Sequence, residues 1–144
     1  MRELETSECW SRLRSSDVGR IAVYSEADGV DIFPVNHVVD GGTVVFRTAH
    51  GTKLASIDDG YPAAFEVDGV DDALYAWSVV VKGTAHVISH REELFEIFDL
   101  DVRPWHDGDK PCFVRINSTS VTGRHFEVAT LGPHDDAHDQ EGGE

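Results

Sequence analysis

The residues with the clearest chemical potential lie in one short segment, RTAHGTK, which runs from Arg47 to Lys53. A guanidinium group, two hydroxyl groups and an ammonium group flank a turn at Gly51. With the free backbone amides of a helical turn, these groups suit a phosphate dianion, because arginine binds two oxygens in parallel and lysine adds charge. The alternative is a solvated hairpin end, but only 12 Lys and Arg exist in the chain, so we favour a phosphate site. Its candidate residues are Arg47, Thr48, Thr52 and Lys53.

A second segment with chemical potential is WSVVVKG, which runs from Trp77 to Gly83. Strand alternation sends Trp77 to one face and Ser78 to the other. A tryptophan beside a serine could frame a planar ring system, with the Ser78 hydroxyl donating a hydrogen bond. The alternative, which the spacing alone favours, is that Trp77 belongs to the core of the fold.

The charge and hydropathy of the chain limit its partners. A net charge of −15 argues against nucleic acid, whose phosphates are bound by Lys and Arg. It does not exclude one phosphorylated small molecule, because charges more than about 8 Å apart are largely screened at physiological salt. No apolar run reaches the roughly 18 residues of a membrane-spanning helix, and MRELETSECW carries charges where a signal peptide is apolar. We therefore expect a cytoplasmic protein without a membrane partner.

Neither metal chemistry nor hydrolysis is indicated. None of the eight histidines belongs to an HxxxH pair on a predicted helix or to a Cys/His ligand set, and no G-x-S-x-G element is present. We therefore predict no functional metal site. Cys9 and Cys112 lie far apart, and we expect two reduced, partly buried thiols rather than one disulfide.

The elements that must position these residues are mostly strands. A helix capped by Thr6 and ending near Arg14 comes first. Short strands in hairpin succession follow, with Gly83 marking a bulge in a long strand. A capping box at Ser89 predicts a second helix to about Leu100. The predicted strand segments are GRIAVYS, GVDIFPVNHVV, TVVFRT, AAFEVDGV, LYAWSVVVKGTAHVIS and CFVRINSTSVTGRHFEV, the last forming one or two strands.

This pattern predicts a mainly β fold, a meandering or Greek-key barrel with peripheral helices. Residues 1–131 form one domain in this interpretation. Residues 132–144, GPHDDAHDQEGGE, have five acids and no base, so we expect a disordered tail.

The order of these segments resembles the pyridoxamine 5'-phosphate oxidase-like, FMN-binding split-barrel family, and within it the small branch that includes the nitroimidazole-resistance proteins. The resemblance covers roughly residues 5–127, and its R-T-x-x-G-T-K element is fairly specific. The matching residues are Gly19 to Ala22, Pro34 to Asn36, Phe46 to Thr48, Gly51 to Lys53, Trp77 to Val79, Lys82 with Gly83, and Thr122 to Arg124.

The resemblance implies an FMN site. Arg47, Thr48 and Lys53 would hold the phosphate. The segment of Pro34, Val35 and Asn36 would run beside the isoalloxazine and the ribityl chain, and Trp77 and Ser78 would approach from the strand that closes the site. The flavin would lie in the interface of a homodimer, which fits a barrel too small to enclose a three-ring cofactor.

Two residues beside that site carry alternatives. His37 would interact with a substrate or with the flavin N5, or would be a polar strand residue that faces solvent. Arg124 would cap the site or pair with an interface carboxylate, or would form a salt bridge at the barrel rim.

The expected function is that of an FMN-dependent oxidoreductase that passes electrons or hydride from a reduced nicotinamide to a small-molecule acceptor. Oxidation of vitamin B6 is not expected, because the longer basic signature and substrate-gripping C-terminal segment of the true oxidases are missing. The alternatives are a deazaflavin-dependent reductase on the same barrel and a non-enzymatic flavin or haem carrier or sensor.

Overall fold

The computed structural model describes residues 1–48, 57, 59–72, 74–88 and 112–128. One helix and seven strands are found in these ranges. They are β1 (Arg2–Glu3), α1 (Thr6–Arg14), β2 (Val18–Ser25), β3 (Gly29–Asp40), β4 (Thr43–Thr48), β5 (Pro62–Asp71), β6 (Tyr75–Val87) and β7 (Cys112–Glu127).

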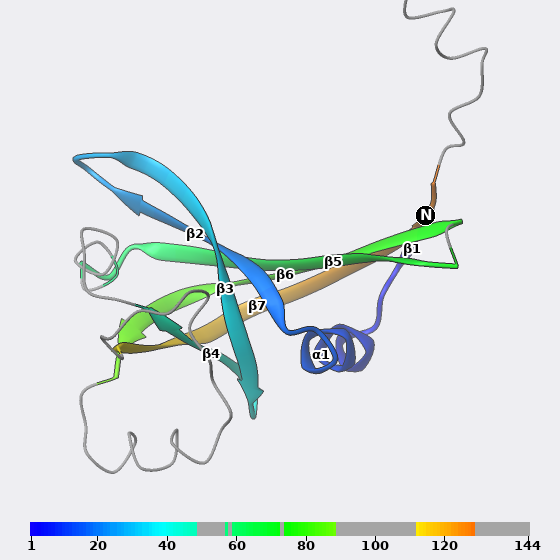
Figure 1. Cartoon of the computed structure of the whole chain (residues 1–144), viewed down its shortest axis with the longest axis horizontal. Helices are drawn as coiled ribbons and strands as arrows, with labels where there is room; N and C mark the ends of the chain where they lie inside the picture. The colour runs from blue at the N-terminus through cyan, green and yellow to red at the C-terminus, as the bar shows by residue number, and fades with distance from the viewer. Residues whose placement is uncertain (49–56, 58, 73, 89–111, 129–144) are drawn as a thin grey trace, which may run out of the picture.

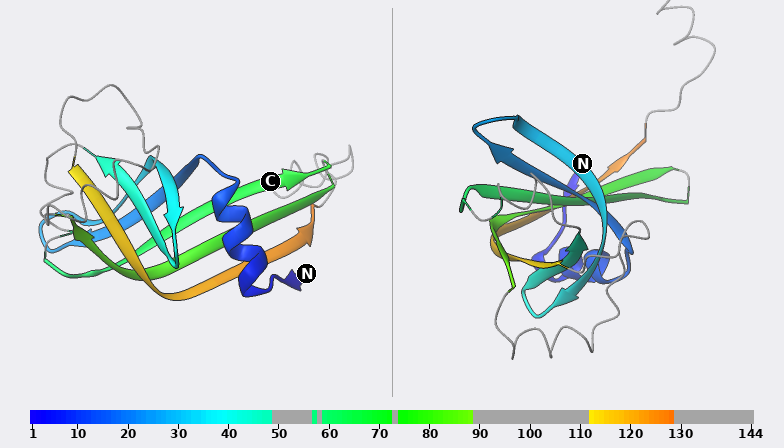
Figure 2. Two further views of the ribbon diagram at one scale, coloured as in Figure 1. Left: turned by 90° about the horizontal axis from the view of Figure 1, so that it is seen from below. Right: turned by 60° about the vertical axis from the view of Figure 1, so that its left-hand side comes forward.

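The strands form one antiparallel sheet that closes on itself. Their order is β1-β7-β4-β3-β2-β5-β6, and a further pairing of β6 with β7 completes a ring (Figure 1). β5, β6 and β7 run on beyond the ring, and α1 lies across this extension (Figure 2). The expected β-barrel of the split-barrel type is confirmed.

Strand alternation determines which side chains fill the barrel. In β6, Trp77, Val79 and Val81 are buried, whereas Lys82 is exposed. The pairing of β6 with β7 shifts register between Lys82 and Gly83, so the predicted bulge at Gly83 is confirmed. The odd-numbered residues of β5 and β6 therefore face the core, and the even-numbered ones form an outer face.

The helix α1 closes the inner face of the extension. Its Cys9 and Leu13 are fully buried in the main core. The expected helix span is correct, but Thr6 is not its cap. Glu5 occupies the N-cap position, and its backbone N–H donates to the Glu8 carboxylate at 3.3 Å. The predicted cap is wrong because a pair of glutamates forms the reciprocal hydrogen bonds of a capping box, in which the N-cap residue is usually a short polar one.

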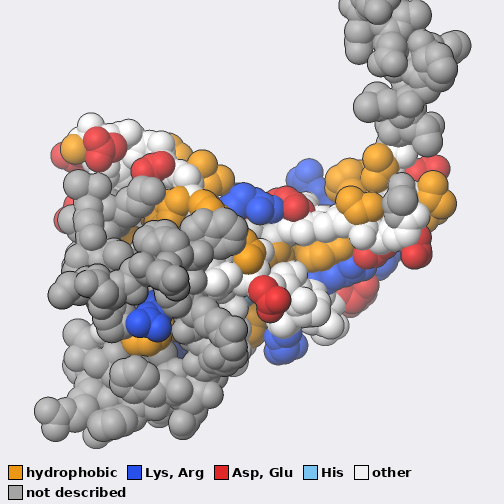
Figure 3. Space-filling model, in the orientation of Figure 1, with side chains coloured by type: hydrophobic (Ala, Val, Ile, Leu, Met, Phe, Trp, Pro, Cys, Tyr) orange, Lys and Arg blue, Asp and Glu red, His pale blue; other side chains and the backbone are white. Residues whose placement is uncertain are grey.

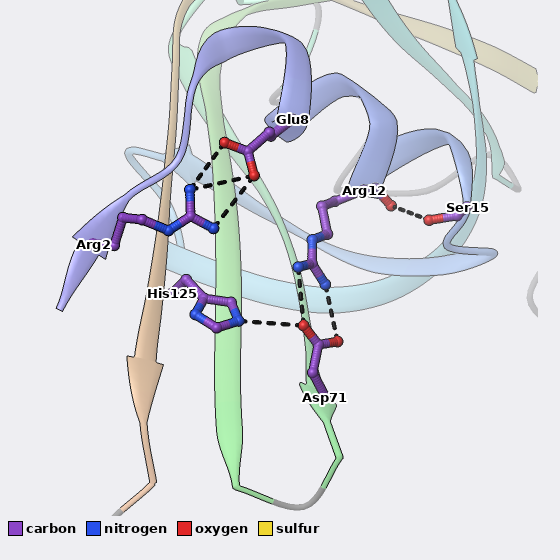
Figure 4. A network of polar contacts seen from close by, with 6 residues as sticks. All are labelled: Arg2, Glu8, Arg12, Ser15, Asp71 and His125. Atoms are coloured by element: carbon purple, nitrogen blue, oxygen red, sulfur yellow. Dashed lines mark hydrogen bonds and ion pairs between the residues drawn. The ribbon is translucent and has the colours of Figure 1, made fainter.

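A polar network fastens α1 to the tip of the β5–β6 hairpin (Figure 4). Arg12 donates two hydrogen bonds to Asp71, at 3.0 and 2.9 Å, and His125 Nε2 lies 3.3 Å from the same carboxylate. These hydrogen bonds from Arg12 lower the pKa of Asp71. The Tyr75 ring stacks on His125 with 5.2 Å between centroids, so helix, hairpin and β7 are joined at one point.

The last strand and the two cysteines bear on further expectations. The last segment forms one strand of 16 residues rather than two. Cys9 and Cys112 are both buried and free, so the expectation of two reduced thiols is confirmed. The predicted second helix, the turn at Gly51 and the acidic tail lie outside the described residues.

Candidate functional site

The candidate site begins where β3 and β4 lie side by side. Their register pairs His37 with Phe46, so Asn36 and Arg47 occupy the next positions along the two strands. Phe46 and His37 are buried, and neighbouring residues of a strand point to opposite faces. The side chains of Asn36 and Arg47 therefore lie on the outer face of the barrel.

The outer face near Arg47 has an apolar floor. A small cluster separate from the main core joins Val45, Ile88 and Phe113, with Val38 packed against it. The Arg47 guanidinium lies over the Phe113 ring, 5.8 Å from its centroid. The site thus combines a cation with apolar surface, the two properties that a ligand with an anionic end and a flat ring requires.

Among the described residues, no carboxylate forms an ion pair with Arg47. Arg12, Arg20 and Arg115 each form an ion pair with a carboxylate, but no ion pair of Arg47 is found within the described ranges. On a chain with a net charge of −15, a half-buried guanidinium without a carboxylate neighbour in the described structure is well suited to an anion.

Strand alternation divides the predicted site residues between two faces. Thr48 follows Phe46 on the inner side of β4, at the end of the strand, and is half-buried. Val35 is 2% exposed and packs in the core, so its side chain does not reach the outer face. Thr52 and Lys53 lie outside the described residues. The residues with outward side chains are Pro34, Asn36, Arg47 and Ser78.

His37 points into the barrel, so the expectation of a solvent-facing residue is wrong. Its ring is 5% exposed, and Nε2 donates to the Leu13 carbonyl at 2.9 Å. It also meets Phe65 edge to face, with 4.8 Å between centroids. Burial lowers the pKa of the imidazole. Because His37 and Asn36 lie on opposite faces of β3, the histidine is not placed to contact a ligand on the outer face.

The side chains of Trp77 and Ser78 also point to opposite faces of the sheet. Trp77 is 8% exposed within the main core, and the Arg12 guanidinium lies 4.7 Å from its ring centroid. This confirms the core interpretation that the spacing favoured. Ser78 faces outward, paired with Asp68 on one side and Arg124 on the other. It is three strands away from Asn36 along the order β3-β2-β5-β6.

Residues 5–125 match the sequence profile of the family described as pyridoxamine 5'-phosphate oxidase. The chain belongs to this family. An uncharacterized protein of Mycobacterium tuberculosis, Rv3129, is 38% identical over 99 residues, which cover 69% of this chain and 86% of that one.

Two solved structures share both fold and sequence with this member of the family. The FAD binding protein from Mycobacterium smegmatis is 35% identical with a TM-score of 0.75, and the match covers 89% of this chain and 100% of that one. A candidate pyridoxamine 5'-phosphate oxidase from Corynebacterium glutamicum is 36% identical with a TM-score of 0.76, covering 90% and 95%. The expected family is therefore confirmed, and its members include flavin-binding proteins.

The family fold also presents a charged group that the sequence did not reveal. On the outer face, Arg20 contacts Glu66 at 2.9 Å and Asp68 at 2.6 Å. Burial raises the pKa of Glu66, whereas the hydrogen bond with Glu66 lowers the pKa of Asp68. Of the two carboxylates, Glu66 is therefore the more readily protonated. Their spacing of two in β5 was a visible signal, but the position of Arg20 depends on the pairing of β2 with β5.

A second group that sequence reasoning missed lies at the β3–β4 hairpin. Arg115 is 9% exposed and donates to Asp40 at 2.9 Å and to Thr43 at 2.7 Å. It fixes the hairpin that carries Arg47. No sequence signal identifies it, because the contact depends on the register of β4 with β7.

Neither a metal-binding cluster nor a membrane-spanning helix is found in the described part of the chain. Within it, no group of three or more His, Cys, Asp or Glu residues is arranged to hold a metal ion. None of its helices has the length and apolar character needed to cross a membrane.

Proposed function

We propose that this protein binds FMN on the outer face of the β3–β4 pair and uses it as an oxidoreductase. The observation that carries the proposal is the Arg47 guanidinium, which has an apolar floor beneath it and no ion-pair partner within the described structure. Arg47 would hold the phosphate together with Thr52 and Lys53, whereas Thr48, predicted as a further ligand, has its side chain on the inner side of β4. Pro34 and Asn36, on the neighbouring strand, would lie along the ribityl chain and the ring.

A bound flavin supplies reversible electron or hydride transfer, here from a reduced nicotinamide to a small-molecule acceptor. The residues of the chain bind and orient it. The guanidinium neutralises the phosphate, the Asn36 amide can hydrogen-bond a polar ring edge, and the cluster around Phe113 excludes water from the ring face. We place this reaction in the cytoplasm, where reduced nicotinamides are available.

The proposal includes a homodimer with the flavin at its interface. The barrel interior is filled by its own core, so the cofactor must bind outside. Ser78 is three strands from Asn36, and strands are spaced about 4.8 Å apart. A ligand held by Arg47 would therefore meet Ser78 most directly on a second copy, and a two-fold axis would give two equivalent sites.

Two other cofactors compete with FMN. The similarity to the FAD binding protein from Mycobacterium smegmatis favours FAD as the second candidate, since both share the flavin ring and its first phosphate. A deazaflavin is less well supported, because its long acidic tail would need more cations than this outer face offers. A flavin or haem carrier without turnover is the remaining alternative.

The test starts with the visible spectrum of the freshly purified protein. The two bands of an oxidised flavin support the proposal, and their absence after incubation with FMN and with FAD refutes it. Chromatography of the released cofactor distinguishes FMN from FAD. Turnover of NADH or NADPH with a flavin-type acceptor then separates an enzyme from a carrier.

The phosphate site is tested by replacing its cations. The double variant Arg47→Ala, Lys53→Ala should weaken flavin binding at least about tenfold, because each charge-assisted hydrogen bond contributes about 1.5–3 kcal/mol. Arg14→Ala is the matched control, since Arg14 is an exposed cation on α1 without an ion pair in the described structure. Unchanged flavin affinity in the double variant, with its fold intact by circular dichroism, would exclude this phosphate site.

A further inference from the structure

A groove of about 250 Å³ opens on the outer face of the sheet, beside the β2–β3 hairpin. β2 pairs with β5 only from Arg20 to Ala22, where Ala22 lies opposite Ala64. Beyond Ala22 the hairpin turns away from β5 (Figure 1), and the groove lies where the two strands separate. Figure 3 shows apolar side chains gathered beside this hairpin. The groove is lined mainly by Ala22, Tyr24, Val30, Pro62, Ala64 and Lys82.

Two alanines form the floor of the groove. Ile21, which precedes Ala22, and Phe65, which follows Ala64, are fully buried. The methyl groups of Ala22 and Ala64 therefore point to the outer face. Because these two residues lie directly opposite each other, they leave a low apolar surface, and covering such a surface with a planar ring is favourable.

The aromatic wall of the groove is held in place by its neighbours. Tyr61 meets the Tyr24 ring edge to face, with 5.0 Å between centroids. The Tyr61 hydroxyl donates a hydrogen bond to the Glu26 carboxylate at 3.2 Å. Because these contacts already orient Tyr24, the protein loses less conformational entropy when a ligand packs against this ring. An aromatic wall also favours an aromatic ligand, which can stack on the ring or meet its edge.

Lys82 supplies a positive charge at the groove. It lies opposite Ala64 in the pairing of β5 with β6, and it is exposed. No ion pair of Lys82 is found within the described ranges. Glu66, the next outward residue of β5, is held by Arg20 at 2.9 Å. A single ammonium group is a compact point charge, which suits a monoanion better than a phosphate dianion.

The size of the groove limits its occupant. Sites for drug-sized ligands have volumes of about 300–1,000 Å³, so a groove of about 250 Å³ holds a single ring with a short side chain. We propose that this groove binds an aromatic monocarboxylate of one ring. The ring lies on Ala22 and Ala64 against Tyr24, and the carboxylate accepts hydrogen bonds from the Lys82 ammonium group. The site uses none of the residues proposed to bind the flavin, and it goes beyond the proposed function.

The direct test compares two ligands that differ in charge. The purified, isotopically labelled chain is titrated with 3-phenylpropanoate and, separately, with 3-phenylpropanamide, and binding is followed by the NMR shifts of the backbone amides. The carboxylate should bind with a dissociation constant of about 1 mM or lower, and the amide about fivefold more weakly, as expected for one exposed ion pair. The largest shifts should come from Val23, Tyr24 and Ala63, which line the groove. No saturable binding, equal affinities or shifts centred elsewhere would overturn the proposal.

Replacing the cation tests its role. Lys82→Met should lower the affinity for 3-phenylpropanoate about fivefold and leave that for 3-phenylpropanamide within about twofold, because only the carboxylate forms the ion pair. Arg14→Met is the matched control, since Arg14 is an exposed cation on α1, and it should change neither affinity. Loss of both affinities in Lys82→Met, loss of neither, or an equal effect of Arg14→Met would overturn the proposal.

Filling the floor tests the position of the ligand. Ala64→Leu should weaken the binding of both ligands at least about tenfold, because the larger side chain occupies the groove. Ala22→Leu fills the same floor from β2 and should have the same effect, which separates a blocked groove from a local defect of β5. Ala76→Leu is the control, because Ala76 is another half-buried, outward alanine that does not line the groove. Undiminished binding by both floor variants, folded by circular dichroism, would overturn the proposal.

The outcomes can be distinguished from those of the flavin test. A chain that binds no flavin, but binds 3-phenylpropanoate with this dependence on Lys82 and Ala64, supports the groove as a ligand site and refutes the proposed function. A chain that binds flavin but not the carboxylate supports the proposed function and refutes the ligand site. Release of bound flavin by 3-phenylpropanoate would also overturn the proposal, because the ligand would then occupy the flavin site.

Discussion

The buried imidazole of His37 makes protein stability depend on pH in a way that can be isolated. A carbonyl oxygen only accepts hydrogen bonds, so Nε2 must carry the proton that it donates to Leu13. Nδ1 is buried without a hydrogen-bond partner among the described residues. A second proton would place a positive charge in the core, and burial therefore lowers the pKa of this group, although the Leu13 carbonyl and Asp17 act in the opposite direction.

The magnitude follows from linkage between protonation and folding. A histidine in the unfolded chain has a pKa of about 6.5, so at acid pH the unfolded state binds a proton that the folded state refuses. The contribution of His37 to stability is complete above the unfolded pKa and is lost as the pH falls through it. The loss approaches 1.4 kcal/mol per pH unit, and by about pH 5.5 it amounts to as much as about 1.4 kcal/mol.

The perturbation is His37→Gln, compared with the wild type by urea unfolding followed through tryptophan fluorescence. Glutamine can donate to the Leu13 carbonyl from a similar position but does not titrate. At about pH 7.5 the variant should be less stable by about 1–2 kcal/mol, because the ring contact with Phe65 is lost. At about pH 5.5 that gap should shrink by about 1 kcal/mol. The other histidines are common to both proteins and cancel, so a gap that stays constant or widens would refute the reasoning.

Three further predictions concern packing, pairing and thiol chemistry. Gly123→Ala should lower the free energy of unfolding, measured by urea titration, by about 1–3 kcal/mol, because the added Cβ would lie 2.7 Å from Cys9 Sγ. Gly42→Ala is the control and should change that free energy little, because a Cβ added there has no atom within 4 Å. Arg115→Ala should cost about 1–3 kcal/mol through the lost bond to Asp40, and an Arg115→Lys variant that is equally unstable would point to the planar fork rather than the charge. Cys9 and Cys112 are both buried, and burial raises the pKa of the Cys9 thiol. Both cysteines should therefore react with Ellman's reagent only after denaturation, and rapid reaction of the native protein would show that the thiols are accessible.

Much of the architecture could be predicted because the alternation of side chains along a strand is visible in the local sequence. The outward positions of Ser78 and Arg47 follow from the two-residue alternation of a strand. The bulge could be predicted because Gly83 lies in the interior of a long strand. The phosphate candidates of β4 could be placed on a strand end for the same reason. The placement of Thr52 and Lys53 stays a prediction.

The features that could not be predicted from the sequence depend on which strands become neighbours in the sheet. Arg20 meets Glu66 across 46 residues of sequence, and nothing local encodes that register. The burial of His37 is not predictable from the sequence for a related reason. Both faces of β3 are partly covered, so its hydrophobic pattern does not show which side is the core, and the burial of the ring depends on a carbonyl from α1.

The position of β7 in the chain has a consequence for synthesis on the ribosome. This strand follows the other strands of the ring in sequence, yet it pairs with both β4 and β6. Until Cys112–Glu127 has left the exit tunnel, a nascent chain has two strands with unpaired backbone groups, which can template association with other chains. The barrel can therefore close only after β7 has emerged, and truncated products that end before β7 should aggregate rather than accumulate as folded fragments.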